Sequence, residues 1–191
     1  VESEGTKARL QSTEKQLALY RYENQLFNLL LDQSGRFDLK ALPEPPALIR
    51  SEDRTRSVQL TVQETSARLS LLRTRLVSQK RTLALKQELV NSLRPVYESG
   101  GIAKFNYLTS VDELQRLDSQ IAETTQQLTA TTGQAARQVS SNSRQILALE
   151  AQLIALQEQQ RNLTLKAQQP GEVFNLSVGP GSVIGSGAEV M

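Results

Sequence analysis

Cysteine and histidine are both absent from this chain of 191 residues. Their absence excludes thiol nucleophiles and histidine general bases, and it removes nearly every zinc or redox-metal site. The carboxylates that remain are scattered singly, so no pair of chemical groups is placed for catalysis. The sequence therefore predicts a protein that is not an enzyme and holds no cofactor or metal. The lack of cysteine also slightly favours a compartment outside the cytoplasm.

Aromatic residues are scarce as well, at 4% of the chain, and hydrophobic residues make up 38%. This supply is lean for a thick globular core. It suits helices that share one narrow apolar seam, because a coiled-coil seam needs only two apolar positions in every seven. The 22 basic and 20 acidic residues are well mixed, and no basic run contains interleaved aromatics. Nucleic acid is therefore not an expected partner.

A signal peptide is absent, and no apolar run approaches the ~18 residues that a membrane-spanning helix needs. The chain opens on "VESEGTKARL" without an initiator Met and closes on "GAEVM". We interpret the sequence as an interior part of a longer protein, with any targeting segment and membrane anchor outside it.

Three helices are predicted, the first over residues 4–32, where apolar residues recur at spacings of three, four or seven. Gly35 ends this helix, and three prolines between residues 43 and 46 prevent a new one until about residue 51. Residues 33–50 are therefore a connector. Ser51, which two acidic residues follow, is the expected start of the second helix.

Heptad patterns run through the second helix, residues 51–98, and the third, residues 104–163. The second helix has a seam at Val58, Val62, Thr65, Leu69, Leu72, Leu76, Gln79, Leu83, Lys86, Val90, Leu93 and Tyr97. The third has steps of seven at Tyr107, Leu114, Ile121, Leu128, Ala135, Asn142, Leu149, Leu156 and Leu163. Its expected companion row, four residues on, is Val111, Asp118, Thr125, Thr132, Val139, Ile146, Leu153 and Gln160.

Two features weaken these helices. Pro95 predicts a kink or a loosened last turn in the second helix. The middle of the third helix, "TTQQLTATTGQAARQVSSNSRQ", is rich in Thr, Ser and Gln and contains Gly133. That composition predicts a bend or local looseness, and it favours a loose environment over a register-setting role for Asn142.

Gly100 and Gly101 separate the two heptad patterns and predict a tight turn between antiparallel helices. The expected product is a long coiled-coil hairpin, roughly 70 to 90 Å in length, with its tip at residues 99–103. The second helix is shorter than the third, so the first helix should lie beside the lower part of the third. We expect three helices near the base and two near the tip.

The period changes after residue 163. Residues 164–191 contain five Gly and two Pro between short β-type runs. This segment is too short to bury a core alone and is expected to be part of a β module whose other strands precede residue 1. The predicted fold is therefore mainly α, with an α-helical hairpin domain at residues 1–163 inserted into a partial β module.

Two motifs make this layout resemble the periplasmic adaptors, or membrane fusion proteins, of the haemolysin-D type. The tail "LKAQQPGEVFNLSVGPGSVIGSGAEVM" is similar to the second half of their lipoyl, or barrel-sandwich hybrid, domain. The tip "GGIAKFNYL" is similar to the Gly-x-Ile-(Ser/Ala)-Lys stretch that follows their hairpin turn. The tail has no Met-Lys-Met hairpin, so a lipoyl-type cofactor carrier is not expected.

The resemblance implies a function in export from the cell. Such adaptors lie in the periplasm, are anchored to the inner membrane and form rings. They sit on an inner-membrane transporter and dock their hairpin tips on a TolC-like outer-membrane channel. The resemblance favours a type I secretion or related ABC exporter over drug efflux.

The tip is the predicted partner-binding site. Its candidate residues are Arg94, Val96, Tyr97, Ser99, Gly100, Gly101, Ile102, Ala103 and Lys104. In the drug-efflux branch an Arg, a Leu and a Ser near the tip serve docking, and the matching positions here are Ser92, Val96 and Ala103. All three depart from that pattern, and Arg94 lies nearby but off register.

A different class of protein fits the same helices. A structural or tethering coiled coil would work as a homodimer without a channel partner. Its seams would pair between two chains, whereas those of a hairpin pair within one chain.

Overall fold

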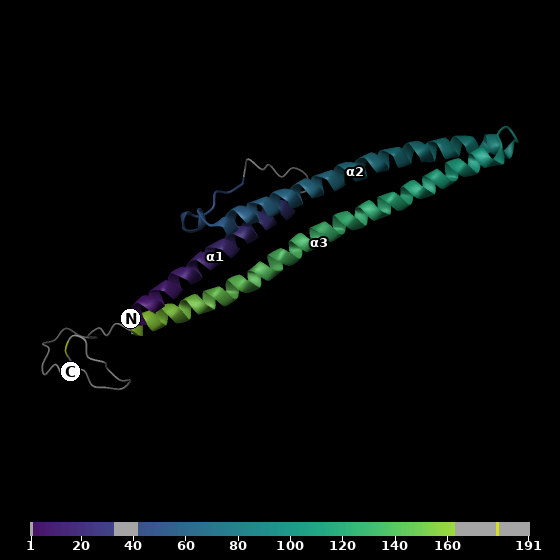
Figure 1. Ribbon diagram of the computed structural model, residues 1–191. Coiled ribbons are helices and arrows are strands. Elements are labelled where there is room, and N and C mark those ends of the chain that lie inside the picture. The colour runs from purple at the N-terminus through teal and green to yellow at the C-terminus, as the bar shows by residue number, and fades with distance from the viewer. Residues whose placement is uncertain (1, 33–41, 163–178, 180–191) are drawn as a thin grey trace.

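The structure, a computed structural model, describes residues 2–32, 42–162 and 179 (Figure 1). These residues form the helices α1 (Glu2–Asp32), α2 (Asp53–Glu98) and α3 (Lys104–Asn162), with a short 3-10 helix, η2 (Ala47–Ile49), before α2. The mainly α fold is confirmed, and the described ranges contain no strand. The partial β module at 164–191 and the first half of the connector fall outside the described residues.

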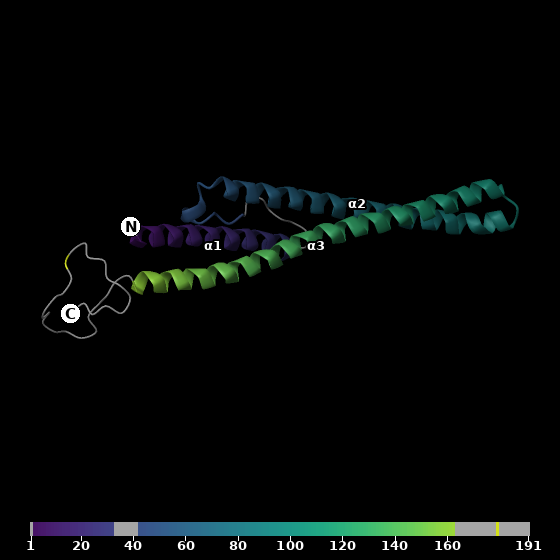
Figure 2. The same ribbon diagram turned by 60° about the horizontal axis from the view of Figure 1, so that its bottom comes forward.

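The helices form a rod (Figures 1 and 2). The chain runs to the tip in α2, turns, and returns in α3, so the antiparallel hairpin is confirmed. The first turn of α1 and the last turn of α3 lie at the same end of the rod, opposite the tip. No helix in the described ranges combines the length and apolarity that crossing a bilayer requires.

The rod has three sections rather than two. The first residues of α2 lie beside Lys15 and Tyr20, the partners of Glu52 and Arg54. Among the described helices, the earlier part of α1 therefore has only α3 beside it, and the tip section consists of α2 and α3 (Figure 2). The expectation of three helices at the base was wrong, because α2 starts halfway along α1. The three-helix section, which we call the junction, lies between two two-helix sections.

The start of α2 also differs from the expected one at Ser51. Ile49 is buried, and its carbonyl accepts hydrogen bonds from the Glu52 amide and the Thr55 hydroxyl. These bonds use residues 50–52 for a turn, so α2 begins at Asp53 with Glu52 at its N-cap.

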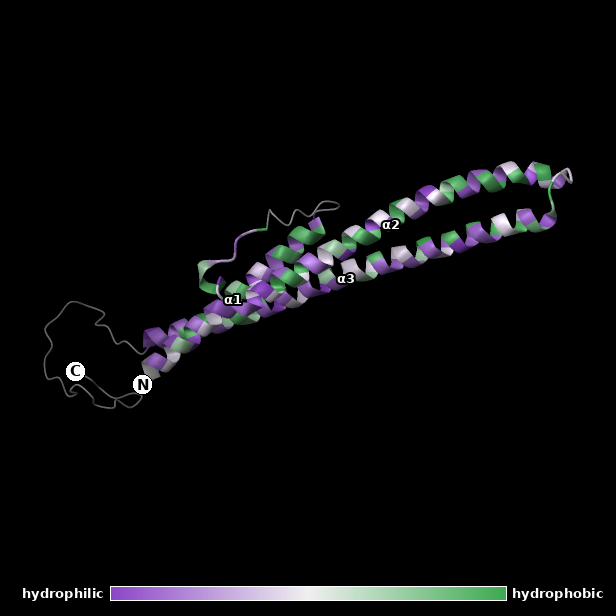
Figure 3. Ribbon diagram, turned by 45° about the horizontal axis from the view of Figure 1, so that its top comes forward, coloured by the Kyte–Doolittle hydropathy of each residue, from purple (hydrophilic) through white to green (hydrophobic). Residues whose placement is uncertain are grey.

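The seam of α2 is confirmed at all of its predicted positions. Five of them are buried (Val58, Val62, Leu69, Leu72 and Val90), and the other seven are half-buried. Figure 3 shows apolar and polar residues alternating around each helix, as expected for narrow seams. Burial of such a seam supplies most of the stability of a long helix in water.

The seam of α3 is confirmed in its main row, whose described members are all buried or half-buried. The companion row is half-buried at Val111 and from Thr132 to Gln160, but Asp118 and Thr125 are exposed. Near the tip the second row is instead Ser110, Leu117, Thr124 and Thr131. The spacing thus changes at Ala135, where two steps of four follow one another. Such an insertion locally unwinds a coiled coil, and it occurs at the junction, where α1 joins the hairpin.

The core of the protein lies at the junction. Leu19, Tyr22, Leu26, Phe27 and Leu30 of α1 pack there against residues of η2, α2 and α3. The Tyr22 hydroxyl donates to the Pro43 carbonyl at 3.0 Å, which ties the end of the connector to α1. The junction is therefore the one described section in which three helices share a core.

Neither Pro95 nor Gly133 interrupts its helix. α2 remains helical through Pro95 to Glu98, and α3 is continuous over 59 residues. In the polar middle of α3, hydroxyl groups form hydrogen bonds within the helix. Each of five hydroxyls donates to the carbonyl four residues earlier: those of Thr124, Thr125, Thr131, Thr132 and Ser143. Asn142 is 1% exposed rather than loosely hydrated.

Candidate functional site: the hairpin tip

The end of α2 is closed by two nested backbone hydrogen bonds. The Gly101 amide donates to the Val96 carbonyl at 2.8 Å, and the Gly100 amide donates to the Tyr97 carbonyl at 3.0 Å. This pair of bonds is the Schellman motif, which satisfies carbonyls that the helix end leaves free. Gly100 has a φ of 78°, in the left-handed region that glycine adopts without a steric penalty.

Gly101 is needed for a different reason. A Cβ at this position would lie 2.8 Å from Val96 Cγ1 and 3.2 Å from the Val96 carbonyl oxygen. Space is therefore lacking at Gly101, whereas at Gly100 the backbone conformation is the constraint. The two glycines together hold the tip in one tight conformation.

The start of α3 carries positive charge. Ala103 precedes the helix, and its carbonyl accepts hydrogen bonds from the Asn106 and Tyr107 amides. The first turn contains no acidic residue, and Lys104 begins it. A helix N-terminus carries a partial positive charge, so Lys104 adds to a positive potential that favours an acidic partner.

Two tyrosines close the hairpin just inside the turn. The rings of Tyr97 and Tyr107 stack in parallel, with centroids 4.7 Å apart and planes 2° apart. Arg94 Nε donates a long hydrogen bond of 3.5 Å to the Tyr107 hydroxyl, and this bond raises the pKa of Arg94. The last seam layer is therefore an aromatic pair flanked by a cation, and stacking of this kind stabilises by about 0.5 to 1.5 kcal/mol.

The structure brings the predicted site residues together at the tip. Two of them, Tyr97 and Ile102, are half-buried. The exposed ones are Arg94, Val96, Ser99, Gly100, Gly101, Ala103 and Lys104. The position of Ser92 is exposed too, but its hydroxyl donates to the Leu89 carbonyl of its own helix.

Sequence reasoning missed two residues of this surface. Phe105 is 78% exposed and Leu108 is 49% exposed, both in the first turns of α3. The signal that could have identified them is their position outside the heptad seam. An apolar residue there does not pack between the two helices of the hairpin. Val96, near the end of α2, is exposed as well, and we call these three residues on the two arms of the hairpin the apolar tip.

An ion pair joins the two arms below the turn. Lys86 of α2 donates to the carboxylate of Glu113 in α3, and both side chains are partly exposed. The hydrogen bond and the charge of Lys86 lower the pKa of Glu113. This pair replaces an apolar seam layer at Lys86 and favours the antiparallel register of the hairpin.

The glycines of the turn give a matched set of substitutions. Gly100→Ala should lower the free energy of unfolding by about 1 to 2 kcal/mol, the cost of placing a Cβ in the left-handed region. Gly133→Ala should raise it by about 0.5 to 1 kcal/mol, because its Cβ would meet only Arg137 Nη1, at 3.6 Å. Urea unfolding followed by circular dichroism measures both.

Gly101→Ala tests the lack of space separately. It should also destabilise the protein, and Val96→Ala should relieve that loss in the double variant, because Val96 Cγ1 is the nearest atom. If all three glycine substitutions changed stability equally, the described turn would be incorrect.

Acid should abolish the contribution of the Lys86 pair. The pKa of Glu113 is lower in the folded state than the ordinary value of about 4.3. The pair therefore stabilises fully above that value, and its contribution disappears as the pH falls through the lower folded pKa. Glu113→Gln should lower the Tm at neutral pH and leave it unchanged in strong acid. Glu88→Gln, at an exposed site on α2, is the control; a Glu113→Gln effect independent of pH would contradict the pairing.

Comparison of the chain with protein-family models, curated proteins and solved structures gives no match. The geometry of the tip and the motif resemblance therefore carry the functional argument.

Proposed function

We propose that this chain is the helical hairpin part of a periplasmic adaptor of the haemolysin-D type. In the intact protein it connects an inner-membrane transporter of the ABC exporter type to a TolC-like outer-membrane channel. The tip of the hairpin is the docking surface, and the protein acts in export without catalysing a reaction.

The exposed apolar tip is the observation that carries this proposal. Val96, Phe105 and Leu108 are 40%, 78% and 49% exposed, although each could be polar without affecting the seam. Large apolar side chains exposed at one end of the rod suit contact with another protein. Arg94 and Lys104 are exposed at the same end of the rod, so this end suits a partner with apolar residues and carboxylates.

The direction of the rod supports the same proposal. α1 begins and α3 ends at the end opposite the tip, which suits a hairpin inserted into a module at the base. The α3 helix alone has a length of roughly 90 Å, calculated at 1.5 Å per residue. A rigid arm of this length suits a protein that reaches across a compartment to a distant partner.

A row of exposed leucines on α2 supports ring formation in the intact protein. Leu71, Leu85 and Leu89 lie on one flank of the helix and are 68%, 68% and 46% exposed. Their spacings of 14 and four residues keep them in one row. This row, away from the seam, suits lateral contact between copies of the hairpin.

The alternative, a tethering coiled-coil homodimer, needs seams that are available to pair with a second chain. Here the seam positions of α2 and α3 are covered by residues of the same chain. A homodimer would have to open the Schellman turn and separate the tyrosine stack, so the intramolecular hairpin is favoured.

Photo-cross-linking tests the proposal in the intact protein. A benzophenone amino acid at position 105 should cross-link to the periplasmic end of a TolC-like channel, and one at position 154, exposed near the base of α3, should not. Equal cross-linking from both positions, or none from position 105, would rule out docking through the tip.

A further inference from the structure

A row of apolar and small side chains runs along α2 outside the seam. The row, which we call the α2 row, consists of Leu60, Ala67, Leu71, Ser78, Leu85 and Leu89. Its four leucines are 52%, 68%, 68% and 46% exposed, in chain order. At ~100° per residue, the six residues lie within ~40° of one another around the helix. A line of exposed leucines of this kind suits contact with another helix.

A second row runs along α3, also outside the seam, and contains no charged residue. Its members follow one another at steps of four and three residues, which is the spacing of a coiled-coil seam. This α3 row consists of Gln115, Ser119, Ala122, Gln126, Thr129 and Gly133, and all but Gly133 are exposed. Because most of these side chains are small, they leave room for the leucines of a facing helix.

The two rows point to opposite sides of the hairpin. Seen along the rod, each row is rotated from the seam of its own helix by roughly 150°, and the sense of rotation is the same for both. Since the two seams face each other, equal rotations leave the rows pointing in opposite directions. The hairpin can therefore contact one neighbour through α2 and another through α3.

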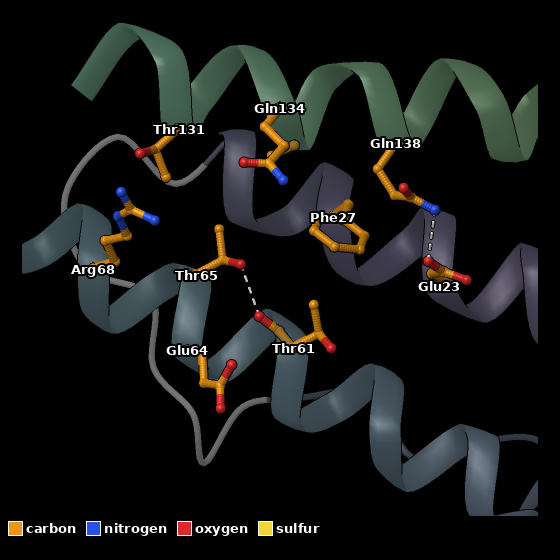
Figure 4. Close-up of a pocket in the computed structure, with 10 residues that line it drawn as sticks. Glu23, Phe27, Thr61, Glu64, Thr65, Arg68, Thr131, Gln134 and Gln138 are labelled. Atoms are coloured by element: carbon orange, nitrogen blue, oxygen red, sulfur yellow. Dashed lines mark hydrogen bonds between the residues drawn. The ribbon is translucent and has the colours of Figure 1, made fainter. Parts of the chain in front are cut away.

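Residues of α2 and α3 that lie at the same level along the rod can be found by counting from an ion pair. Lys86 pairs with Glu113, and the helices are antiparallel, so residues equally far before Lys86 and after Glu113 are level. Arg68 and Thr131, each 18 residues away, agree with this count, because they line the same end of the cavity at the junction (Figure 4).

Charged residues of opposite sign are level with one another on the two helices. The pairs are Arg81 with Asp118, Arg75 with Glu123, and Glu64 with Arg137. All six residues are exposed, and none forms an ion pair with a described residue. When two copies stand side by side with their tips at the same end, α2 of one copy opposes each of these charges with the opposite charge on α3 of the next.

A contact between the α2 rows of two copies is disfavoured by charge. Residues 65–87 of α2 contain six basic residues and no acidic one, so pairing this stretch with itself brings like charges together. Residues 112–123 of α3, in contrast, contain four acidic residues and one basic residue. The charges therefore select α3 of another copy as the partner of the α2 row.

We propose that the α2 row packs against the α3 row of a second copy of this chain, side by side and with both tips at the same end. This contact deepens the ring formation proposed above, because it names the face of the neighbouring copy that receives the leucines. The two rows are different surfaces, so each copy in a pair keeps one row free and can add a further copy. Contacts of this heterologous kind close into a ring when the rotation between copies allows it.

Disulfide cross-linking in a cysteine-free form of the intact protein tests the contact. Two differently tagged copies, one with Ser78→Cys and the other with Ala122→Cys, are expressed together and oxidised. Ser78 is eight residues before Lys86 and Ala122 is nine after Glu113, so the two positions are level. The two copies should be joined by a disulfide, which needs Cα atoms within about 7 Å. Gln120→Cys, at an exposed position off the α3 row, is the control and should not be joined to Ser78→Cys.

Charge reversal tests the register of the same contact. Arg81→Glu should lower the yield of the mixed disulfide by about twofold to fivefold, because it replaces attraction with repulsion at an exposed pair. Asp118→Arg in the same chain should restore the yield, and circular dichroism confirms that each variant is folded. Disulfides between two Ser78→Cys copies in place of the mixed pair, no disulfide at all, or no restoration by Asp118→Arg would overturn the proposal. None of these results changes the cross-linking expected between position 105 and the channel, so the two proposals can fail separately.

Discussion

Replacing both Phe105 and Leu108 with Glu is expected to weaken binding of the intact protein to a TolC-like channel by roughly thirtyfold or more. A hot spot at the centre of an interface contributes about 2 kcal/mol or more. Phe105 is the most exposed large apolar residue at the tip. The substitutions remove apolar contact and place negative charge where we expect the partner to carry carboxylates. Surface plasmon resonance with the immobilised channel measures the affinity.

The control for this prediction lies on the same helix. Ile154→Glu changes a residue that is 58% exposed near the base, and it should leave the affinity unchanged. Phe105→Leu should retain most of the binding, because the surface remains apolar. If the tip variant bound as tightly as Ile154→Glu, the apolar tip would not be the docking surface.

Leu26→Ala is expected to lower the free energy of unfolding by about 2 to 5 kcal/mol, the range for buried leucines. Leu26 is 0% exposed and belongs to the core at the junction. The junction is enclosed on three sides, so neighbouring residues cannot easily fill the space that the substitution leaves. Urea unfolding monitored at a helical circular dichroism signal measures the loss.

Leu71→Ala provides the comparison for Leu26. Leu71 is 68% exposed on α2, and surface substitutions of this kind change stability by about 0.5 kcal/mol or less. Equal effects of the two substitutions would contradict the burial of α1 against the hairpin.

The helical part of the fold could be predicted from the sequence because heptad periodicity is a local signal that repeats. Every predicted seam position of α2 is buried or half-buried, from Val58 to Tyr97. The turn could be predicted as well, because Gly100 and Gly101 interrupt two long patterns that otherwise match.

The predictions that were wrong concerned features that depend on contacts between residues distant in the sequence. Asp118 and Thr125 are exposed because the seam spacing changes at Ala135, a residue that packs in the core with α1. The hydroxyls in the polar middle of α3 bond to carbonyls of their own helix, and α3 is continuous through this stretch. The hydrogen bond from Gln138 of α3 to Glu23 of α1 had no signal in the sequence, because the two residues are 115 positions apart.

The residues of the tip were predicted only in part, because exposure also depends on contacts between distant residues. The glycine pair and the sequence motif identify the residues of the turn. Phe105 and Leu108 differ from buried apolar residues only in their exposure to solvent, which the sequence does not show. Exposed and buried leucines look alike in the sequence, and Leu26 of α1, for example, is buried in the core. The structure separates these two cases.

Small-angle X-ray scattering combined with light scattering tests the central claim, that one chain folds back on itself at Gly100 and Gly101. We predict the mass of a single chain and a maximum dimension of about 100 Å, set mainly by α3 at 1.5 Å per residue. The mass of two chains with a maximum dimension of roughly 160 Å or more, the length of α2 and α3 joined in one continuous helix, would contradict the hairpin and the function proposed from it.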